Sequence, residues 1–315
     1  MRILTWIAIV FGAWFFLIAA PSFVSFLIVF SRWSSDPSLH QKNADRAFAP
    51  FRDRTGPAMQ LLLTLPLQEL TVRAKDRVTL RADYLDLGSE KTAIFLHGFR
   101  AAPLEAFSTI SLRLRDAGYN LLFVTHRAHG KSGGFFTTLG LREADDALCW
   151  VDRAVGLGAK SVLLYGASMG AASIAYASDR LPEAVRAAVL DSCFLSPSAQ
   201  IRRDGKRLHL PWQPMYPLVL LCGRIFLRDS LRRQVTDPLE CCRVPMLFLH
   251  GEADPTVPLA EGRRCCEACA SQKEWIPVPG AVHAVSPLAG GPALEERIVR
   301  FAENNCNPIQ EEMKK

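Results

Sequence analysis

Short apolar runs that alternate with stretches of helix length constrain this chain more than any other feature of its sequence. The apolar runs span residues 92–96, 120–125, 161–165, 187–190, 245–249 and 274–278. Continuous apolar runs of this length are typical of strands that are buried on both faces of a parallel sheet. Stretches of helix length lie at residues 103–117, 139–155, 169–178, 259–270 and 292–303. This succession predicts an α/β protein with a mostly parallel, doubly wound sheet.

Residues 67–75 and 77–87 have a different pattern, because apolar and polar side chains alternate in both segments. Alternation of this kind predicts an antiparallel pair of strands at the start of the sheet. The chain is 49% hydrophobic and 22% charged, which excludes a disordered protein and a small disulfide scaffold. We expect one domain over residues 67–305, followed by a C-terminal tail over 306–315.

The N-terminal segment is separate from this domain, because residues 3–31 contain no charged side chain. About 20 apolar residues cross the hydrocarbon core of a bilayer, so the run is long enough to span it. A cleaved signal peptide is the alternative, but its apolar region is usually only ~7–15 residues long, and Pro21 would directly follow the cut. The sequence therefore predicts one retained transmembrane anchor over residues 1–31, with Pro21 kinking it or dividing it. Residues 32–66 are expected to form a juxtamembrane connector that contains one short helix.

The orientation of this anchor is predicted from the basic residues on its two sides. Only Arg2 precedes the run, whereas Arg32, Lys42, Arg46, Arg52 and Arg54 follow it. Positive charge is more frequent on the cytoplasmic side, so the counts favour a cytoplasmic catalytic portion of a single-pass protein of the cell membrane. The nine cysteines are odd in number and include two adjacent pairs, which is a poor disulfide framework and agrees with that side.

The motif with the clearest chemistry is a G-x-S-x-G sequence centred on Ser168. It directly follows the predicted strand 161–165 and opens the predicted helix 169–178, which is the context that gives this motif its meaning. Gly166 and Gly170 permit a sharp turn that exposes the serine at the start of a helix. Ser168 is therefore the candidate nucleophile.

A serine nucleophile needs a base, and the base needs an acid that orients it. His283 follows the last predicted strand and precedes the final helix, at the sheet edge where Ser168 is expected, so it is the candidate base. Asp254 follows the preceding strand and is the candidate acid. Asp191 and Glu252 are alternatives for the acid, because each also lies just beyond a predicted strand.

Two backbone N–H groups are candidates for an oxyanion hole, in which preorganised donors stabilise developing negative charge. Met169 follows the nucleophile at the start of its helix, and Phe99 lies in the loop after strand 92–96. The side chain of His97, in the same loop, is expected to be structural.

These residues resemble the α/β-hydrolase superfamily over most of the chain, from about residue 67 to residue 304. The resemblance rests on His97-Gly98-Phe99, Arg127 to Ser132, Gly166 to Gly170, His250 to Pro258 and Gly280 to His283. With the N-terminal anchor, the chain is similar to membrane-anchored bacterial serine hydrolases that are related to depalmitoylase-like and serine aminopeptidase-like proteins. The resemblance implies an α/β-hydrolase fold and a metal-free Ser-His-Asp hydrolase without a cofactor.

An insertion at about residues 194–243 separates the predicted strand at 187–190 from the one at 245–249, and in this fold it would form a helical lid over the site. Its central part, residues 215–233, combines apolar side chains with Arg224, Arg228, Arg232 and Arg233. This composition fits either a helix on an anionic membrane surface or a lid that packs on the core and exposes a solvated basic face.

Two other kinds of site are not favoured. Cys265, Cys266 and Cys269 lie on a predicted helix without nearby histidines, so a buried helix face explains them better than a metal site. The net charge of +6 over the whole chain is too modest to indicate binding of nucleic acid.

The sequence thus predicts a membrane-anchored serine hydrolase that cleaves carboxylic esters or thioesters through an acyl-enzyme. An aminopeptidase-like amide hydrolase would use the same residues, and a non-catalytic scaffold on a hydrolase fold is the third alternative. The expected partners are an acyl ester, thioester or amide substrate and the lipid bilayer. A chain that starts near Trp33 is expected to hydrolyse soluble esters still, because every candidate catalytic residue lies beyond it.

Overall fold

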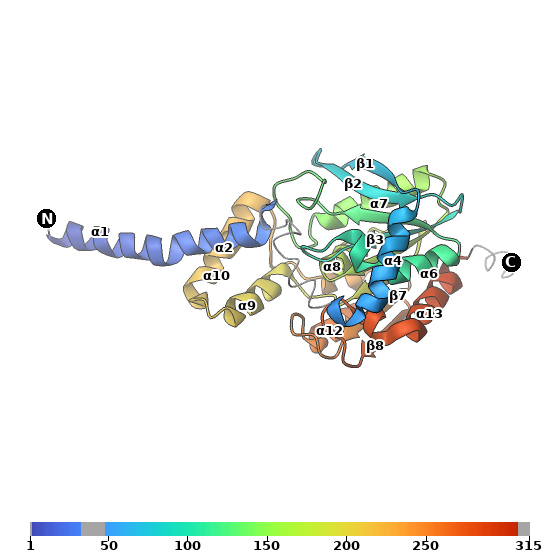
Figure 1. Ribbon diagram of the computed structural model, residues 1–315. Coiled ribbons are helices and arrows are strands. Elements are labelled where there is room, and N and C mark those ends of the chain that lie inside the picture. The colour runs from blue at the N-terminus through green and yellow to red at the C-terminus, as the bar shows by residue number, and fades with distance from the viewer. Residues whose placement is uncertain (1, 33–47, 308–315) are drawn as a thin grey trace.

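The computed structural model describes residues 2–32 and 48–307, and its centre is a single eight-stranded sheet (Figure 1). The strands are β1 (Gln68–Arg73), β2 (Thr79–Leu85), β3 (Lys91–Leu96), β4 (Asn120–Thr125), β5 (Ser161–Ala167), β6 (Val185–Asp191), β7 (Met246–Gly251) and β8 (Lys273–Val278). Their order in the sheet is β1-β2-β4-β3-β5-β6-β7-β8. β1 pairs with β2, and β2 with β4, in antiparallel fashion, and all other pairs are parallel. The predicted mostly parallel sheet and its antiparallel start are confirmed.

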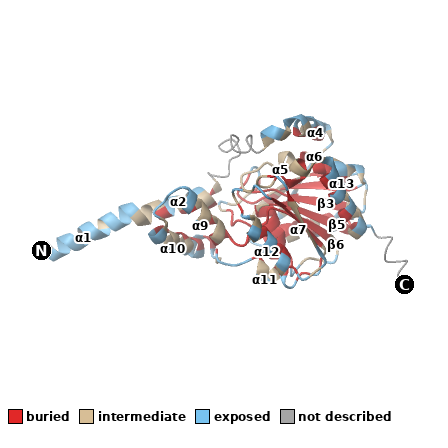
Figure 2. Ribbon diagram, turned by 90° about the horizontal axis from the view of Figure 1, so that it is seen from below, coloured by how far each residue is buried: buried red, intermediate tan, exposed pale blue. Residues whose placement is uncertain are grey.

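Helices cover both faces of the sheet, and its inner strands β3, β5 and β7 are almost entirely buried (Figure 2). One face carries α7 (Glu143–Gly156), α8 (Met169–Ala177), α11 (Thr236–Leu239) and α12 (Leu259–Ala268), and the other carries α4 (Arg52–Thr64), α5 (Pro103–Ala106), α6 (Ser108–Asp116) and α13 (Ser286–Cys306). Successive side chains of a strand point to opposite faces, so β3 contributes Ile94 to one core and Phe95 to the other. Both faces of the sheet therefore bury apolar surface.

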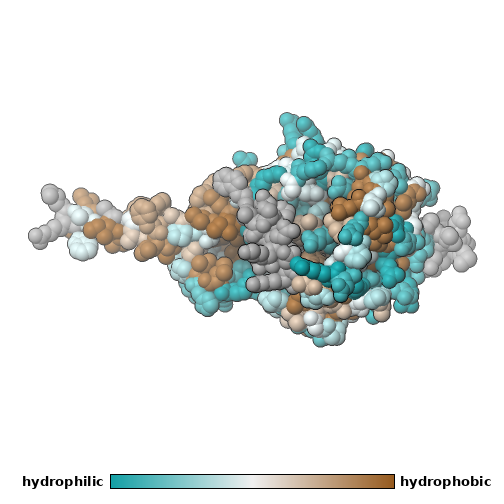
Figure 3. Space-filling view, viewed as in Figure 1, coloured by the Kyte–Doolittle hydropathy of each residue, from teal (hydrophilic) through white to brown (hydrophobic). Residues whose placement is uncertain are grey.

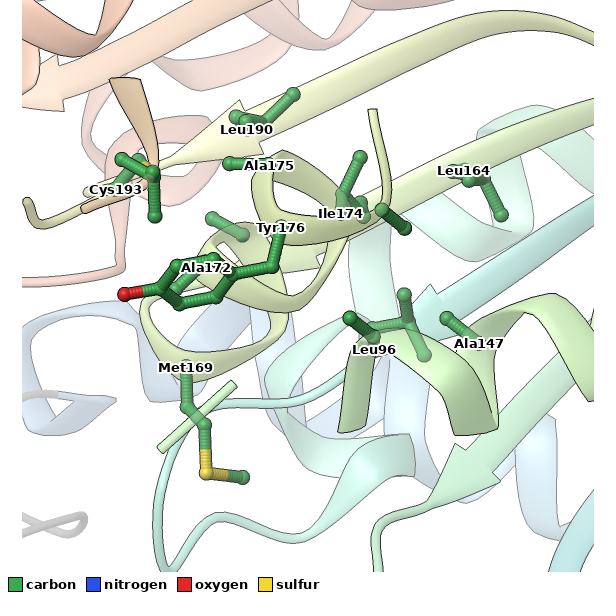
Figure 4. Packing of buried hydrophobic residues seen from close by; sticks show 14 of the residues in the cluster. Leu96, Ala147, Leu164, Met169, Ala172, Ile174, Ala175, Tyr176, Leu190 and Cys193 are labelled. Atoms are coloured by element: carbon green, nitrogen blue, oxygen red, sulfur yellow. The ribbon is translucent and has the colours of Figure 1, made fainter. Parts of the chain in front are cut away.

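The central helix α8 lies directly on the sheet, and every one of its nine residues is buried. Figure 4 shows Ile174 and Ala175 of this helix among Leu164 of β5, Leu190 of β6 and Leu96 of β3. A β-carbon added at Gly170 would lie 1.8 Å from the carbonyl oxygen of Leu96, so only glycine allows this approach. This close packing fixes the start of α8, and with it Ser168, against the end of β3.

Several helix boundaries differ from the predicted ones for local reasons. The stretch predicted as one helix over 103–117 is divided at Phe107 into α5 and α6. The next helix begins at Glu143 rather than at 139, because the Glu143 carboxylate accepts hydrogen bonds from the N–H groups of Thr138 and Gly140 in the preceding turn. The last helix begins at Ser286 rather than at 292 and is broken at Gly291, which has φ +67°.

Residues 32–66 contain more structure than the predicted connector. Residues 33–47 lie outside the described part of the chain, but a short 3-10 turn, η3 (Ala49–Phe51), leads into the 13-residue helix α4. Leu62 is fully buried in the core that α6 and α13 share, and the Arg54 guanidinium donates to the Glu295 carboxylate of α13 at 2.7 Å. Helix α4 is therefore an integral part of the sandwich.

The N-terminal run forms one long helix in three parts, α1 (Arg2–Trp14), the π-helical turn η1 (Phe15–Ala19) and α2 (Ala20–Phe30) (Figure 1). Residues Ile3–Phe30 form a helix that is long and apolar enough to cross a membrane, the one such helix in the described part of the chain. The π-helical turn ends just before Pro21, whose missing N–H cannot close the normal helical hydrogen bond. The regular α-helix is thus interrupted next to Pro21.

The two parts of this helix have different surroundings. Helix α1 projects away from the domain, whereas α2 packs on the insertion between β6 and β7 (Figures 1 and 2). Ser22, Phe26 and Phe30 are spaced by four residues and are fully buried, so they form one contact face of α2. The sequence does not reveal this docked face, because apolar residues occur all around the helix.

The insertion over 194–243 is helical, as predicted, with α9 (Pro197–Arg207), α10 (Trp212–Cys222), the π-helical turn η4 (Gly223–Leu227) and α11. Val219, Leu227 and Leu231 join the main core, which agrees with a lid packed on the domain. Leu221, Ile225 and Phe226 remain exposed, which agrees with the membrane-surface interpretation. Each of the two interpretations thus describes part of the insertion.

Candidate active site

Ser168 lies between the end of β5 and the first residue of α8, in a backbone conformation that is unusual for serine. Its φ of +51° and ψ of −108° place it in a region that non-glycine residues seldom adopt. A β-carbon at Gly166 would lie 2.5 Å from the carbonyl oxygen of Gly170, so the turn cannot form with a larger residue there. The N–H of Ser168 donates to the carbonyl of Asp191 on β6, which ties the turn to the neighbouring strand. The turn presents the hydroxyl of Ser168 at the carboxyl edge of the sheet.

The structure brings the three predicted residues of the relay together. The Nε2 atom of His283 lies 2.8 Å from the Ser168 hydroxyl oxygen, and its Nδ1 atom lies 2.7 Å from a carboxylate oxygen of Asp254. An Nδ1–H that donates to Asp254 leaves Nε2 with a lone pair that can accept the serine proton. The arrangement has the geometry of a serine nucleophile, a base and an orienting acid.

Hydrogen-bond donors to both carboxylate oxygens of Asp254 favour its ionised form. Burial raises the pKa of Asp254, but the hydrogen bond from His283 and its positive charge when protonated outweigh burial, so the pKa is lowered overall. The second carboxylate oxygen accepts the N–H groups of Thr256 at 2.7 Å and Val257 at 2.9 Å. A fixed, negatively charged carboxylate can stabilise an imidazolium that forms at His283.

The two alternative acids are placed elsewhere. Glu252 is exposed, and Asp191 is fully buried and accepts hydrogen bonds from the hydroxyl of Ser286 at 2.6 Å and its N–H at 3.1 Å. Ser192 also donates to Asp191 and accepts from the N–H of Ala284. Asp191 therefore anchors the loop that carries His283 and has no hydrogen bond to its ring.

Both proposed oxyanion donors lie next to the nucleophile turn. Met169 is the first residue of α8, where N–H groups lack helical acceptors, and neither its N–H nor that of Phe99 has an acceptor among the described residues. A β-carbon added at Gly98 would lie 3.5 Å from the Cβ of Ser168, so the loop of Phe99 contacts the nucleophile turn. Two unpaired donors beside a serine can bind the oxyanion of a tetrahedral intermediate.

Two buried histidines hold this loop in place, in agreement with the structural role predicted for His97. The ring of His97 donates from Nδ1 to the carbonyl of Gly98 and accepts the N–H of His126 at Nε2. The ring of His129 donates to the carbonyl of Arg127 and accepts the N–H of Arg100. Burial lowers the pKa of both rings, so each stays neutral and can accept and donate at once.

The end of α2 also contacts this loop, and sequence reasoning missed that contact. The Arg100 guanidinium donates to the carbonyl of Ile28 at 2.6 Å and stacks over the ring of Phe99 with 4.4 Å to its centre. Arg32, the first charged residue after the helix, donates to the carbonyls of Gly130 and Ser132. The break in the apolar run at Arg32 is the one sequence signal that could have indicated a docking point.

The described residues contain no group of three His, Cys, Asp or Glu side chains that could hold a metal ion. Cys265, Cys266 and Cys269 belong to the buried core on α12 and to the turn after it.

No family model matches the chain. It is 26% identical over 224 residues to the uncharacterised protein YqkD of Bacillus subtilis, a match that covers 68% of this chain and 71% of that one. It is 25% identical over 218 residues to an uncharacterised membrane protein of Saccharomyces cerevisiae, YNL320W, covering 67% and 71% of the two chains. These matches include proteins from a bacterium and a yeast.

Solved structures match a larger share of the chain. The Pyrococcus furiosus esterase Pf2001 superposes with a TM-score of 0.65 at 23% identity, covering 78% of this chain and 94% of that one. The α/β hydrolase GrgF from Penicillium superposes with a TM-score of 0.60 at 17% identity, covering 77% and 99%. The fold is thus the α/β-hydrolase fold, as the resemblance implied.

Proposed function

We propose that this chain, which has the α/β-hydrolase fold, is a membrane-anchored serine hydrolase that cleaves carboxylic ester or thioester bonds. The observation that carries the proposal is the relay of two short hydrogen bonds, from Ser168 to His283 and from His283 to Asp254. Strain in the backbone of Ser168 and two unpaired N–H groups beside it support the same chemistry.

In the first half of the reaction, the Ser168 oxygen attacks the substrate carbonyl while His283 Nε2 takes its proton. The N–H groups of Phe99 and Met169 donate to the oxyanion that forms, and Asp254 stabilises the imidazolium. His283 then gives the proton to the departing alcohol or thiol, and the C–O or C–S bond breaks to leave an acyl-serine. Water, deprotonated by the same ring, attacks that ester, and collapse of the second intermediate releases the carboxylic acid and restores Ser168.

The proposed anchor is the helix Ile3–Phe30, and a relative that is named a membrane protein supports it. The catalytic domain is proposed to lie on the cytoplasmic side, because most basic residues near the span follow it. Of these, Lys42 and Arg46 lie outside the described residues, and Arg32 contacts the catalytic domain. Solved neighbours that are named esterases favour an ester or thioester as the substrate.

Labelling with a fluorophosphonate probe tests the nucleophile directly. The full-length protein is expected to react covalently and to hydrolyse p-nitrophenyl butyrate, whereas Ser168→Ala should lose both activities with its thermal melting unchanged.

The two candidate acids, Asp254 and Asp191, provide a matched comparison. Asp254→Asn should lower kcat by up to ~10⁴-fold through the wrong imidazole tautomer, and Asp191→Asn should act mainly on stability, because Asp191 only anchors the His283 loop.

Three results would contradict this proposal. Labelling of another serine in the Ser168→Ala variant would show that the nucleophile is misassigned. A larger loss of kcat in Asp191→Asn than in Asp254→Asn would show that the acid is misassigned. Hydrolysis of amino-acid amides faster than of any ester or thioester would move the substrate class to amides.

A further inference from the structure

An apolar cavity of about 220 Å³ lies between α2 and the helices α9 and α10 of the insertion. Helix α2 forms one wall with Ser25, Ile28 and Val29. The opposite wall is formed by Ile201, Asp204, Gly205, Leu208, Leu210, Trp212, Met215 and Val219. Figure 3 shows hydrophobic side chains gathered where α2 meets the insertion. Part of the N-terminal helix is therefore a wall of a cavity in the catalytic domain.

The walls of this cavity suit an apolar occupant. Ser25, Asp204 and Trp212 are the lining residues with a polar side-chain atom among the described residues, and the Asp204 carboxylate already accepts from Gln200 and pairs with Arg207. An apolar protein cavity of about 150 Å³ stays dry and holds a benzene-sized ligand. A cavity of about 220 Å³ is thus large enough for a segment of an alkyl chain.

The position of the cavity indicates where such a chain comes from. The helix that forms one wall continues into α1, and together they make the candidate membrane span. Leu208 at the cavity, and Leu221, Ile225 and Phe226 beyond it on the insertion, have 65%, 52%, 57% and 45% of their surface exposed. Exposed apolar side chains beside a span are typical of a surface that meets the bilayer.

The cavity also adjoins the loop that carries a proposed oxyanion donor. Ile28, which lines the cavity, accepts a hydrogen bond from the guanidinium of Arg100, and Arg100 packs over the ring of Phe99. The next residue back, Gly98, contacts the turn of Ser168. Ile28 and Arg100 therefore connect a wall of the cavity to the loop that carries the Phe99 N–H.

We propose that this cavity binds the acyl chain of an amphiphilic ester or thioester drawn from the bilayer, so that the enzyme prefers long acyl chains. The inference rests on the proposed function for its catalytic consequence, but the binding of an acyl chain is separable from hydrolysis. The N-terminal helix then has two roles, as an anchor and as one half of the acyl site.

The first experiment fills the cavity from α2 in the full-length protein in phospholipid nanodiscs. Ser25→Trp is compared with Val24→Trp, a matched control on the same helix, because Val24 does not line the cavity and is half exposed. The readout is the ratio of kcat/KM for p-nitrophenyl dodecanoate to that for the butyrate. One buried methylene changes affinity by about fourfold. If Ser25→Trp displaces two or more methylenes of the acyl chain from the cavity, this ratio should fall at least tenfold. In Val24→Trp the ratio should be unchanged. An unchanged ratio in both variants overturns the proposal, and the smaller variant Ser25→Leu replaces Ser25→Trp if the latter does not fold.

The second experiment measures binding without turnover. Palmitic acid with a mid-chain diazirine is photolysed with the full-length Ser168→Ala protein in nanodiscs, and the modified peptides are mapped. The proposal predicts adducts on residues 201–219 that Ser25→Trp suppresses, and adducts confined to residues 2–24 in both proteins contradict it. If the wild type did not label with fluorophosphonate, the proposed hydrolase function would be rejected. The crosslinking result would still test whether the cavity binds an acyl chain.

Discussion

At the residue scale, three buried histidines, His97, His126 and His129, pack together behind the loop of Phe99. The ring centres of His97 and His126 are 4.6 Å apart, and those of His97 and His129 are 5.2 Å apart. Both ring nitrogens of His126 lack a hydrogen-bond partner among the described residues. Burial, together with the charges of His129 and Arg127, lowers the pKa of His126 to about 3.

His126→Phe is expected to make the protein less sensitive to acid. Since the pKa of His126 is lower in the folded than in the unfolded chain, the unfolded state binds the extra proton below about pH 6.5. Stability conferred by the neutral ring is thus complete above that pH and is lost as the pH falls toward 3. The variant lacks the proton that His126 binds in the unfolded chain. The slope of its unfolding free energy against pH should therefore be smaller by about 1.4 kcal/mol per pH unit between pH 6 and pH 4.

Urea unfolding of the wild type and the variant at several pH values measures this slope. His126→Leu is the second variant, in case the larger ring of phenylalanine does not fit. Equal slopes in the wild type and both variants would show that His126 takes up its proton in the folded state as well.

Ser168 and His283 could be predicted from sequence because each has a distinctive neighbourhood, a glycine-flanked turn for one and the loop after the last strand for the other. The choice between Asp254 and Asp191 was harder, because both directly follow strands that end at the same edge. What separates them is the fold of the following loop. The N–H groups of Thr256 and Val257 turn the Asp254 carboxylate toward His283, whereas Ser286 holds Asp191.

At the scale of elements, helix α4 shows what periodicity does not reveal. The strands were predictable because their apolar runs are continuous, but α4 has a weak apolar face and includes Pro57. Its position depends on a buried ion pair with α13, in which the side chain of Glu295 has 2% of its surface exposed. A contact between residues that are 241 positions apart cannot be seen in either segment alone.

Arg54→Met should therefore destabilise the domain by about 3 kcal/mol, because it leaves Glu295 buried with only the more distant Arg113, at 3.6 Å, as a partner. The double variant Arg54→Met with Glu295→Gln should recover most of this loss, since no uncompensated charge remains. Chemical denaturation of the four proteins in this cycle gives the coupling energy. A loss below about 0.5 kcal/mol in Arg54→Met would place α4 loosely on the surface.

At the scale of the whole molecule, the docked part of the N-terminal helix changes one expectation from the sequence. A chain that starts near Trp33 lacks Phe26, whose ring packs with Phe136 and Phe226, and Phe30, whose ring packs on Phe26. It also lacks the Ile28 carbonyl that holds Arg100. A chain that starts at Ala20 keeps all of these contacts. The natural place to divide anchor from domain is thus the π-helical turn before Pro21.

The chain from Ala20 should be more stable than the chain from Trp33 and more active on p-nitrophenyl butyrate. Truncation of one buried phenylalanine costs about 3–5 kcal/mol, so loss of two should lower the melting temperature by at least about 6 °C in a domain of this size. Thermal melts and initial rates in the same detergent compare the two chains. Identical melting and rates would show that α2 contributes nothing to the domain.

In the proposed anchor, α2 is held by the domain, so residues 2–19 are the part of the span left to cross the hydrocarbon layer. Eighteen residues at a rise of 1.5 Å give a helix of about 27 Å, slightly short of an average hydrocarbon core of about 30 Å. The shortfall must be met by thinning of the bilayer or by release of α2 from the insertion. A thicker membrane would then favour release of α2 from the insertion and so open the proposed acyl cavity. We therefore expect the cavity to be best preserved in the thinner membranes of a cell.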